Sequence, residues 1–256
     1  MYKKTNPLKN TISLIFLLPL LLLATNLHCR KNKCLKNAGR TTTVSRSVTP
    51  FEYLVLDGNF TAYIYSDTIP SLQITTGENL VEDIQSYMSG DTLIIKDQSQ
   101  CDFLKGYEEK KIKLAVDSPD YICLKNNASL YSQDTIYAEH LILESLSELQ
   151  KLELCLHCFQ LDLHTGIAAC NYILTGKMHY LYVLTNLHAK VDACGLQVEN
   201  VLVDAGGHGD CCFTASNQLH VCFDNTGDVY YTGNPDTIII ERSQRGTGQL
   251  IHWNEK

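Results

Sequence analysis

The chain has 256 residues, 45% of them apolar, so it is long enough and apolar enough to bury a substantial core. This composition excludes a mostly disordered protein. The 28 acidic residues outnumber the 21 basic ones, which gives a formal charge of -7. A negative surplus opposes contact with phosphate backbones, so we do not expect nucleic acid as a partner.

Residues 1–28 predict a secretory signal peptide. Lys3, Lys4 and Lys9 precede an apolar run from Ile12 to Ala24, which is the layout of such a signal. A single-pass membrane anchor is the alternative, but the run is shorter than the roughly 20 residues that a spanning helix needs. We therefore expect export to the cell envelope, in the periplasm or at the outer membrane.

A cysteine directly after this run predicts a lipid anchor. The segment from Thr25 to Cys29 resembles a bacterial lipobox, in which the cysteine is lipidated and becomes the new N-terminus. Asn26 and His28 depart from the aliphatic and small residues usual at their places. Cleavage near Ala24, which would leave Cys29 an ordinary thiol, is the alternative. Cys29 is the predicted lipidation site and the predicted attachment to the membrane.

Residues 29–47 predict a polar tether. Five basic side chains follow Cys29 within a short distance along the chain: Arg30, Lys31, Lys33, Lys36 and Arg40. We interpret this cluster as a solvated linker between the anchor and the folded part of the chain.

Residues 48–120 predict an irregular, strand-rich lead-in to a single domain that ends at residue 252. Apolar runs at 51–65, 72–75, 92–96 and 112–116 indicate its strands. Between them, Leu80, Val81 and Ile84 stand at helical spacing. We expect a short helix there that caps the open end of the domain.

Residues 121–240 repeat with a period of 20. Second and fourth positions of each unit are mixed, whereas the first and third are apolar, so each unit begins with a strand that buries one face. Turn-forming residues follow at a common offset, for example Asn225 and Gly227. The apolar positions are Tyr121, Leu141, Leu161, Leu181, Val201 and Val221, then Cys123, Leu143, Leu163, Val183, Val203 and Phe223.

Stacked coils explain this repeat most economically. A second apolar run follows each turn, as at 152–156, and no proline interrupts the chain between Pro119 and Pro235. We therefore predict an all-β fold, a right-handed parallel β-helix or solenoid with coils of about 20 residues, followed by a tail at 253–256. An antiparallel sandwich is the alternative, but the gap-free phase argues against it.

Together these features resemble the family of putative auto-transporter adhesin head GIN domains, which is common in envelope proteins of Bacteroidetes-type bacteria. The resemblance covers residues 44–252, and its most specific part is the segment 227–235. The family's Ser-Gly-Ser-Gly corners are replaced here, for example by Asn-Asn-Ala-Ser at 126–129. The resemblance implies a parallel β-helix that is often lipid-anchored and carries an adhesin label. The resemblance assigns no catalytic or binding residues to this chain.

Eleven cysteines are present, many inside strand-like runs, which favours buried thiols. Cys155 and Cys158 have the spacing of a redox or metal motif, but on a strand they would point to opposite faces. Cys170, Cys194 and Cys212 lie at nearby offsets in their repeats. An oxidising envelope would permit a disulfide between stacked coils among these three.

One candidate metal site lies at the repeat corners. His188 and His208 are 20 residues apart, so stacking would place them about 5 Å from each other, with Asp228 in the next coil. Two imidazoles and a carboxylate could hold a divalent metal. Three solvated corner residues are the alternative that we favour, and we predict no cofactor.

The outward positions raise the question of catalysis. Carbohydrate-active β-helices line acids along one outer face, and Asp162, His164, Asp204 and Asp224 take outward positions. They do not share one column, so we predict no catalytic residues and no enzyme. A row of exposed acids is usually a solubility device.

We therefore predict a non-catalytic envelope module, adhesin-like or structural. Its ligand would be an envelope component, a carbohydrate or a protein. A carbohydrate-active enzyme and a ligand-free scaffold are the alternatives. An exposed aromatic strip would favour adhesion, and the candidates for it are Tyr180, Tyr182, Tyr230 and Tyr231.

Overall fold

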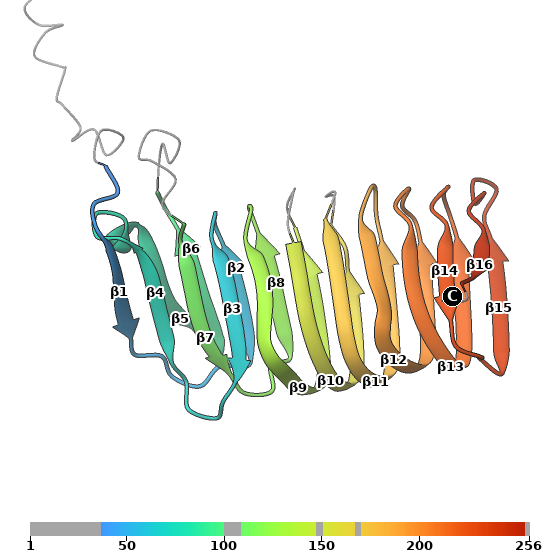
Figure 1. Cartoon of the computed structure of the whole chain (residues 1–256), viewed down its shortest axis with the longest axis horizontal. Coiled ribbons are helices and arrows are strands. Elements are labelled where there is room, and N and C mark those ends of the chain that lie inside the picture. The colour runs from blue at the N-terminus through green and yellow to red at the C-terminus, as the bar shows by residue number, and fades with distance from the viewer. Residues whose placement is uncertain (1–36, 100–108, 147–150, 167–169, 254–256) are drawn as a thin grey trace, which may run out of the picture.

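The computed structural model describes residues 37–99, 109–146, 151–166 and 170–253, which form one stack of β-strands (Figure 1). The stack has about six turns with coils of roughly 20 residues, so the predicted parallel β-solenoid is confirmed. No helix in these ranges is both long enough and apolar enough to cross a membrane. The predicted signal peptide, Cys29 and residues 254–256 of the predicted tail lie outside the described residues.

Five long strands build the regular part of the stack. They are β9 (Ser129–Ser145), β10 (Lys151–His164), β11 (Asn171–Thr185), β12 (Lys190–Ala205) and β13 (Cys211–Phe223), and each pairs in parallel with the next. Each strand bends at its middle, at the lower edge in Figure 1, so that it contributes to both walls of the solenoid. At one bend Gly176 has φ +111°, and a Cβ there would collide with the Leu156 carbonyl. Only glycine fits this close approach of two coils.

The two walls are named here after their C-terminal strands, β14 (Val229–Thr232) and β15 (Thr237–Arg242). The β15 wall consists of β5, β6, β2, β8, the second halves of β9 to β13, and β15. The β14 wall consists of β1, β4, β7, β3, the first halves of β9 to β13, β14 and β16 (Leu250–His252).

The lead-in does not stack in chain order. Strand β2 (Tyr53–Asp57) lies between β6 (Thr92–Asp97) and β8 (Tyr121–Lys125), and β3 (Thr61–Ser66) lies between β7 (Lys111–Val116) and β9. The chain thus begins the solenoid in its second coil, then goes back to build the end. The end strands are antiparallel to their neighbours: β1 (Thr41–Arg46) to β4 (Leu72–Gly77), β4 to β7, and β5 (Ile84–Ser89) to β6.

The core is a set of inward columns between the walls. Leu161, Leu181 and Val201 are buried and pair in register on the β15 wall. Tyr172, Phe213 and Phe223 are the largest side chains that are completely buried. Full burial of one such side chain contributes roughly 1.5–3 kcal/mol, and the repetition of these columns stabilises the stack.

The coil length varies, which corrects the gap-free period of 20. Tyr121 pairs with Ile142 and Asn200 pairs with Gln218, separations of 21 and 18 residues. As a result Tyr121 takes an outward, half-exposed place, although its position in the repeat predicted burial. Cys222, not Asp224, is the partner of Asp204 on the next coil.

Two predictions for the N-terminal end need correction. The helix expected around residues 78–84 is only a 3-10 turn, η2 (Val81–Asp83), because Ile84 already starts β5 with extended backbone. Residues 41–46, placed at the end of the polar tether, form β1, as expected for three consecutive β-branched threonines and a valine. Reversed strands, not a helix, close this end.

A candidate binding hollow on the β15 wall

Outward residues of the β15 wall stand in columns because the strands pair in register. One column contains Asp162, Tyr182, Leu202 and His220, on β10 to β13. The neighbouring column contains His164, Leu184, Asp204 and Cys222, and continues to Glu241 on β15. This face therefore combines aromatic, acidic and imidazole side chains over five adjacent strands, β10 to β13 and β15.

A hollow of about 510 Å³ opens on this face. Its volume is in the range of known small-molecule sites. Aromatic, amide and imidazole groups form most of its lining. The lining side chains with polar groups are Gln160, Tyr180, Tyr182, Asn200, Asn217, Gln218 and His220.

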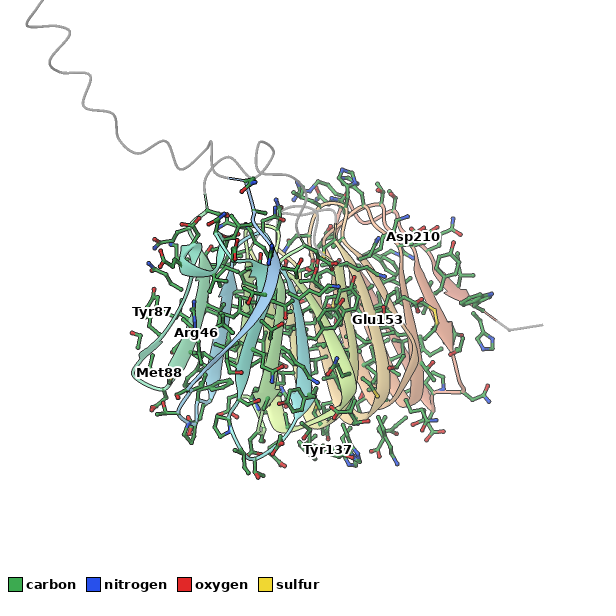
Figure 2. All side chains as sticks on the ribbon, turned by 60° about the vertical axis from the view of Figure 1, so that its left-hand side comes forward. Arg46, Tyr87, Met88, Tyr137, Glu153 and Asp210 are labelled. Carbon is green, nitrogen blue, oxygen red and sulfur yellow. A yellow bond between two sulfur atoms is a disulfide. The ribbon has the colours of Figure 1, made fainter. Side chains whose placement is uncertain are left out.

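An aromatic row runs along the bend below the hollow. The rings of Tyr137 and His157 lie 5.5 Å apart, and Phe159 contacts His179 at 5.2 Å and Tyr180 at 5.4 Å, measured between ring centroids. Tyr137 marks the lower edge of the molecule in Figure 2. Tyr180 belongs to both the row and the hollow, and 46% of its surface is exposed. Exposed aromatic side chains that lie together, as in this row, are typical of interaction surfaces, whereas singly exposed ones are common on any protein.

Hydrogen bonds fix the polar groups around the hollow. Asp162 is held by His140 Nε2 at 2.9 Å and accepts a hydrogen bond from Gln160 Nε2 at 2.9 Å. Asn217 Nδ2 donates to Asn200 Oδ1 at 2.7 Å. These contacts hold the polar groups in fixed orientations, and such orientation lowers the entropic cost of association where a ligand binds.

Tyr182 and Asp204 form a second fixed pair. The Tyr182 hydroxyl donates to Asp204 Oδ2 at 2.6 Å. This hydrogen bond, aided by partial burial, raises the pKa of Tyr182 to about 12. On the next coil, burial and the negative charges of Asp204 and Glu241 raise the pKa of the Cys222 thiol to about 11. Negative charge therefore accumulates beside the hollow.

The outward acids predicted from the sequence are spread out. Asp162 and Asp204 lie on β10 and β12, with β11 between them, so their strands are roughly 10 Å apart. His164 stacks edge-on against Tyr182, at 6.0 Å between ring centroids. Asp224 follows the end of β13 and is exposed.

The corner histidines stack as predicted, but Asp228 does not join them. The rings of His188 and His208 lie 5.3 Å apart, and His208 Nδ1 contacts Thr226 Oγ1 at 2.8 Å. Asp228 Oδ1 accepts a hydrogen bond from the Gln249 amide at 2.8 Å instead. The favoured prediction of three solvated corner residues, with no metal held by His188, His208 and Asp228, stays a prediction.

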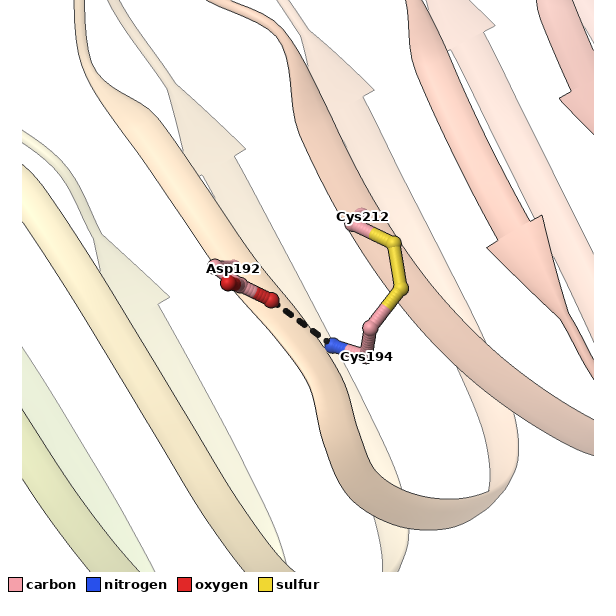
Figure 3. Close-up of side chains that lie close together, drawn as sticks. All are labelled: Asp192, Cys194 and Cys212. Atoms are coloured by element: carbon pink, nitrogen blue, oxygen red, sulfur yellow. Dashed lines mark hydrogen bonds between the residues drawn. A yellow bond between two sulfur atoms is a disulfide. The ribbon is translucent and has the colours of Figure 1, made fainter. Parts of the chain in front are cut away.

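A disulfide joins two coils on the outer face of the β14 wall. Cys194 on β12 is bonded to Cys212 on β13, with the Cα atoms 5.2 Å apart, and Asp192 accepts a hydrogen bond from the Cys194 amide (Figure 3). The sequence had named both cysteines as candidates together with Cys170. Asp192 lies beside both sulfur atoms, but a disulfide offers no thiolate to a metal.

The other cysteine and tyrosine predictions have mixed outcomes. Cys155 is half-exposed and Cys158 is buried, so they face opposite sides as predicted, and burial raises the pKa of Cys158 to about 12. Tyr180 and Tyr182 lie on the β15 wall. Tyr230 and Tyr231 lie on β14, and Tyr231 stacks on His252 at 4.7 Å. The four tyrosines therefore do not form one strip.

The sequence analysis missed the amides of the hollow and a compact cluster of His220, Cys222 and Glu241. His220 and Cys222 are two residues apart on one strand, a spacing that places both side chains on one face. This signal was visible in the sequence. Glu241 could not be added to it, because its alignment with Cys222 depends on the shorter coil.

Comparison with known proteins identifies the fold family. The model of the family described as "Putative auto-transporter adhesin, head GIN domain" matches residues 50–235. No curated protein matches the chain by sequence.

Solved structures with a similar fold include two putative adhesins. The one from Bacteroides fragilis has 19% identity and a TM-score of 0.75, covering 84% of this chain and 97% of its own. The one from Parabacteroides distasonis has 16% identity and a TM-score of 0.66, covering 86% and 99%. A putative lipid binding protein from P. distasonis has 15% identity and a TM-score of 0.61, covering 86% and 99%. At these identities the similarity establishes the fold alone.

Proposed function

Because the chain belongs to the family of putative auto-transporter adhesin head GIN domains, we propose that it is a non-catalytic binding module of the bacterial envelope that holds a carbohydrate in the hollow of the β15 wall. The observation that carries the proposal is the lining of that hollow. Two tyrosines stand beside four amide side chains and an imidazole, over a bend that carries an exposed aromatic row.

This lining suits sugars on chemical grounds. The apolar C–H face of a sugar ring packs on a tyrosine ring, and sugar hydroxyls both donate and accept hydrogen bonds. An amide side chain carries a carbonyl acceptor and two N–H donors, so the Gln218 amide and the groups that the Asn217–Asn200 hydrogen bond leaves over match a hydroxyl in either role. Asp162 and Asp204 add negative charge, so neutral or amino sugars should bind better than acidic ones.

Binding of a glycan panel to the purified mature chain would test the proposal. Tyr180→Ala should lower the affinity for the best ligand about tenfold or more, because truncation of a central aromatic side chain removes much of the binding free energy. Tyr230→Ala is the matched control, since this half-exposed tyrosine lies on β14 and should leave affinity unchanged.

Two outcomes would contradict the proposal. Glycan binding that survives Tyr180→Ala would place the ligand elsewhere, and binding of no glycan would favour a protein ligand or a scaffold role. The same mixtures should be assayed for released reducing ends, since turnover would show an enzyme.

The proposal includes a lipid anchor at Cys29. Its support is the apolar run and the lipobox-like segment, which lie outside the described residues. The intact mass of protein extracted from native-type membranes tests it. A diacyl or triacyl increment on a chain that starts at Cys29 is expected, whereas an unmodified chain starting near Thr25 would refute the anchor.

A further inference from the structure

Three metal-ligand side chains converge beside the hollow. His220 and Cys222 lie two residues apart on β13 and project from the same face, and Glu241 is the register partner of Cys222 on β15. His220 Nε2 is 3.2 Å from Glu241 Oε1 and 3.6 Å from Cys222 Sγ. All three donor atoms lie within 4.8 Å of one another.

These distances match tetrahedral zinc. With zinc–ligand bonds of about 2.0–2.3 Å and tetrahedral angles, neighbouring nitrogen and oxygen ligands are roughly 3.3 Å apart, and nitrogen and sulfur ligands roughly 3.6 Å apart. The two separations that involve His220 agree with these values, and the donor atoms of the third pair, Cys222 and Glu241, lie within 4.8 Å of each other.

The surroundings also favour a cation. The carboxylates of Asp204, Glu241 and Asp224 all act electrostatically on Cys222. Asp204 is oriented by Tyr182, the type of outer contact that positions groups around a metal. Cys222 is moreover a half-exposed free thiol in a protein that also contains a coil-to-coil disulfide. Coordination to Zn²⁺ would release the thiol proton and hold Cys222 as the thiolate ligand.

We propose that His220, Cys222 and Glu241 bind one Zn²⁺ ion, with a fourth position open to water or to a ligand at the rim of the hollow. A thiolate and an imidazole favour zinc over magnesium or calcium, which take oxygen ligands. The site stands independently of the proposed carbohydrate binding, because its argument uses only the three ligands and their neighbours.

Metal titration of the chelator-treated mature chain, with the Cys194–Cys212 disulfide intact, tests the site. Zn²⁺ should bind at one ion per chain by calorimetry, and Co²⁺ should give the charge-transfer absorption of a cobalt–thiolate bond. Cys222→Ser should abolish that absorption and lower the affinity for Zn²⁺ at least tenfold. Cys155→Ser, which removes another half-exposed free thiol, is the matched control and should change neither.

Substoichiometric Zn²⁺ binding by the wild-type chain would overturn the proposal. So would a cobalt–thiolate absorption that survives Cys222→Ser. Circular dichroism of each variant, with the Cys194–Cys212 disulfide intact, checks that loss of metal is not loss of fold. Glu241→Gln, on an exposed side chain, gives a second variant that should fold normally and bind more weakly.

A separate observation concerns the C-terminal end of the stack. Within the described residues, β15 pairs only with β13, so its other edge is open. Ile238 and Ile240 continue the inward columns of Leu219 and Val221, yet they are 42% and 47% exposed. An apolar strand with a free edge is a template for another strand.

The sequence of this edge is complementary to itself. In an antiparallel pair of two β15 strands centred on Ile239, Ile238 of one copy is opposite Ile240 of the other, which joins the two cores. The same register places Thr237 opposite Glu241 and Asp236 opposite Arg242, so unlike charges meet and like charges do not.

From this edge we infer that two copies of the chain associate end to end through β15, around a two-fold axis at Ile239. The self-matching register favours a closed dimer over a head-to-tail filament, because the two β15 edges pair with each other and neither remains free for a third copy. The occupant of the edge is thus a second copy of this chain.

Cysteine crosslinking tests this register directly. Ile239→Cys should give a disulfide-linked dimer under mild oxidation, because the residue faces itself across the axis, whereas Thr237→Cys should not. Light scattering over a range of concentrations should show a dimer, and Ile239→Lys should make the chain monomeric. Ile142→Lys, an outward isoleucine in the same column on β9, is the control. A wild-type monomer at all concentrations, or filaments, would overturn the inference.

Discussion

Each end of the solenoid has unpaired strand edges and an apolar core, and the two ends differ in how these are covered. At the N-terminal end, β1 and β5 run against their neighbours, and Arg46 joins the walls: its guanidinium donates to Ser86 Oγ at 3.1 Å and to the Val81 carbonyl at 3.0 Å. Figure 2 labels Arg46 together with Tyr87 and Met88 of β5 at that end of the molecule.

At the C-terminal end, β15 remains parallel and presents isoleucines. Arg242 lies over the Phe223 ring at 4.5 Å and donates to the Gly248 carbonyl, but it does not reach across to another wall. The comparison teaches that reversal of strand direction, together with a bridging polar side chain, closes a stack, whereas direct continuation leaves it able to extend.

Core truncations near each end should give the largest effects. Ile95→Ala, beneath the closed end, should cost about 2–5 kcal/mol of the free energy of unfolding. Phe223 is larger, but its ring lies beneath Arg242 at the open end, where neighbours can relax into the space. We therefore expect Phe223→Ala to cost no more than Ile95→Ala, as measured by urea denaturation. A clearly larger cost would show that the open end is as rigidly packed as the closed one.

Reduction of the Cys194–Cys212 disulfide should come next. The bond spans 18 residues, for which loop-closure entropy predicts a loss of roughly 3 kcal/mol. Because it lies in the C-terminal half, hydrogen exchange should speed up in β13 to β16 more than in β1 to β8. The double variant Cys194→Ala, Cys212→Ala should reproduce the reduced protein, and uniform acceleration over the chain would contradict the comparison.

The two end arginines should differ in a smaller way. Arg46→Ala removes two hydrogen bonds from a charged donor and should cost about 1.5–3 kcal/mol. Arg242→Ala removes the cation–π contact with Phe223 and hydrogen bonds to the Gly246 and Gly248 carbonyls, but these groups all belong to the open end and the Arg242 side chain is exposed to competing water, so the change should cost less than Arg46→Ala. Thermal unfolding of both variants gives the ranking, and the reverse ranking would refute the role given to Arg46.

Tyrosine titration should show the smallest effect. The pKa of Tyr182 is raised mainly by its hydrogen bond to Asp204, so the folded state favours the neutral phenol, and this contribution to stability is lost as pH rises from about 10 to about 12. Asp204→Asn should return Tyr182 toward its ordinary pKa in ultraviolet titration.

Tyr121, nearer the closed end, is the counterpart of Tyr182. Burial is the larger cause of its raised pKa, and the hydrogen bond to Glu144 is the smaller one. Glu144→Gln should therefore remove a smaller share of the pKa shift of Tyr121 than Asp204→Asn removes of the shift of Tyr182. An equal response in both tyrosines would contradict the assigned causes.

Much of the regular half could be predicted because its rule is local. Alternation along each strand and a nearly constant coil length identify Leu161, Leu181 and Val201 as one buried column. Tyr121 was misplaced because corners add or remove one or two residues, and only strand pairing reveals that. The insertion of β2 and β3 into the second coil depends on contacts between distant segments, which no local pattern encodes.

The hollow and the metal-ligand cluster were missed for the same reason. Gln218, His220 and Cys222 align with their neighbours at a separation of 18 residues, so a period of 20 assigns them to the wrong columns. The disulfide was partly predictable, because Cys194 and Cys212 lie on adjacent coils at nearby offsets whichever length is used.

The disulfide also gives the molecule a mechanical property. Tension along the solenoid axis pulls perpendicular to the strands, so coils would peel from the exposed C-terminal end one after another. Strands β16, β15 and β14 would be released first, and then β13 as far as Cys212, where the covalent bond to β12 holds. From that point the bond carries the load to Cys194, and the residues between Cys194 and Cys212 are shielded from further extension.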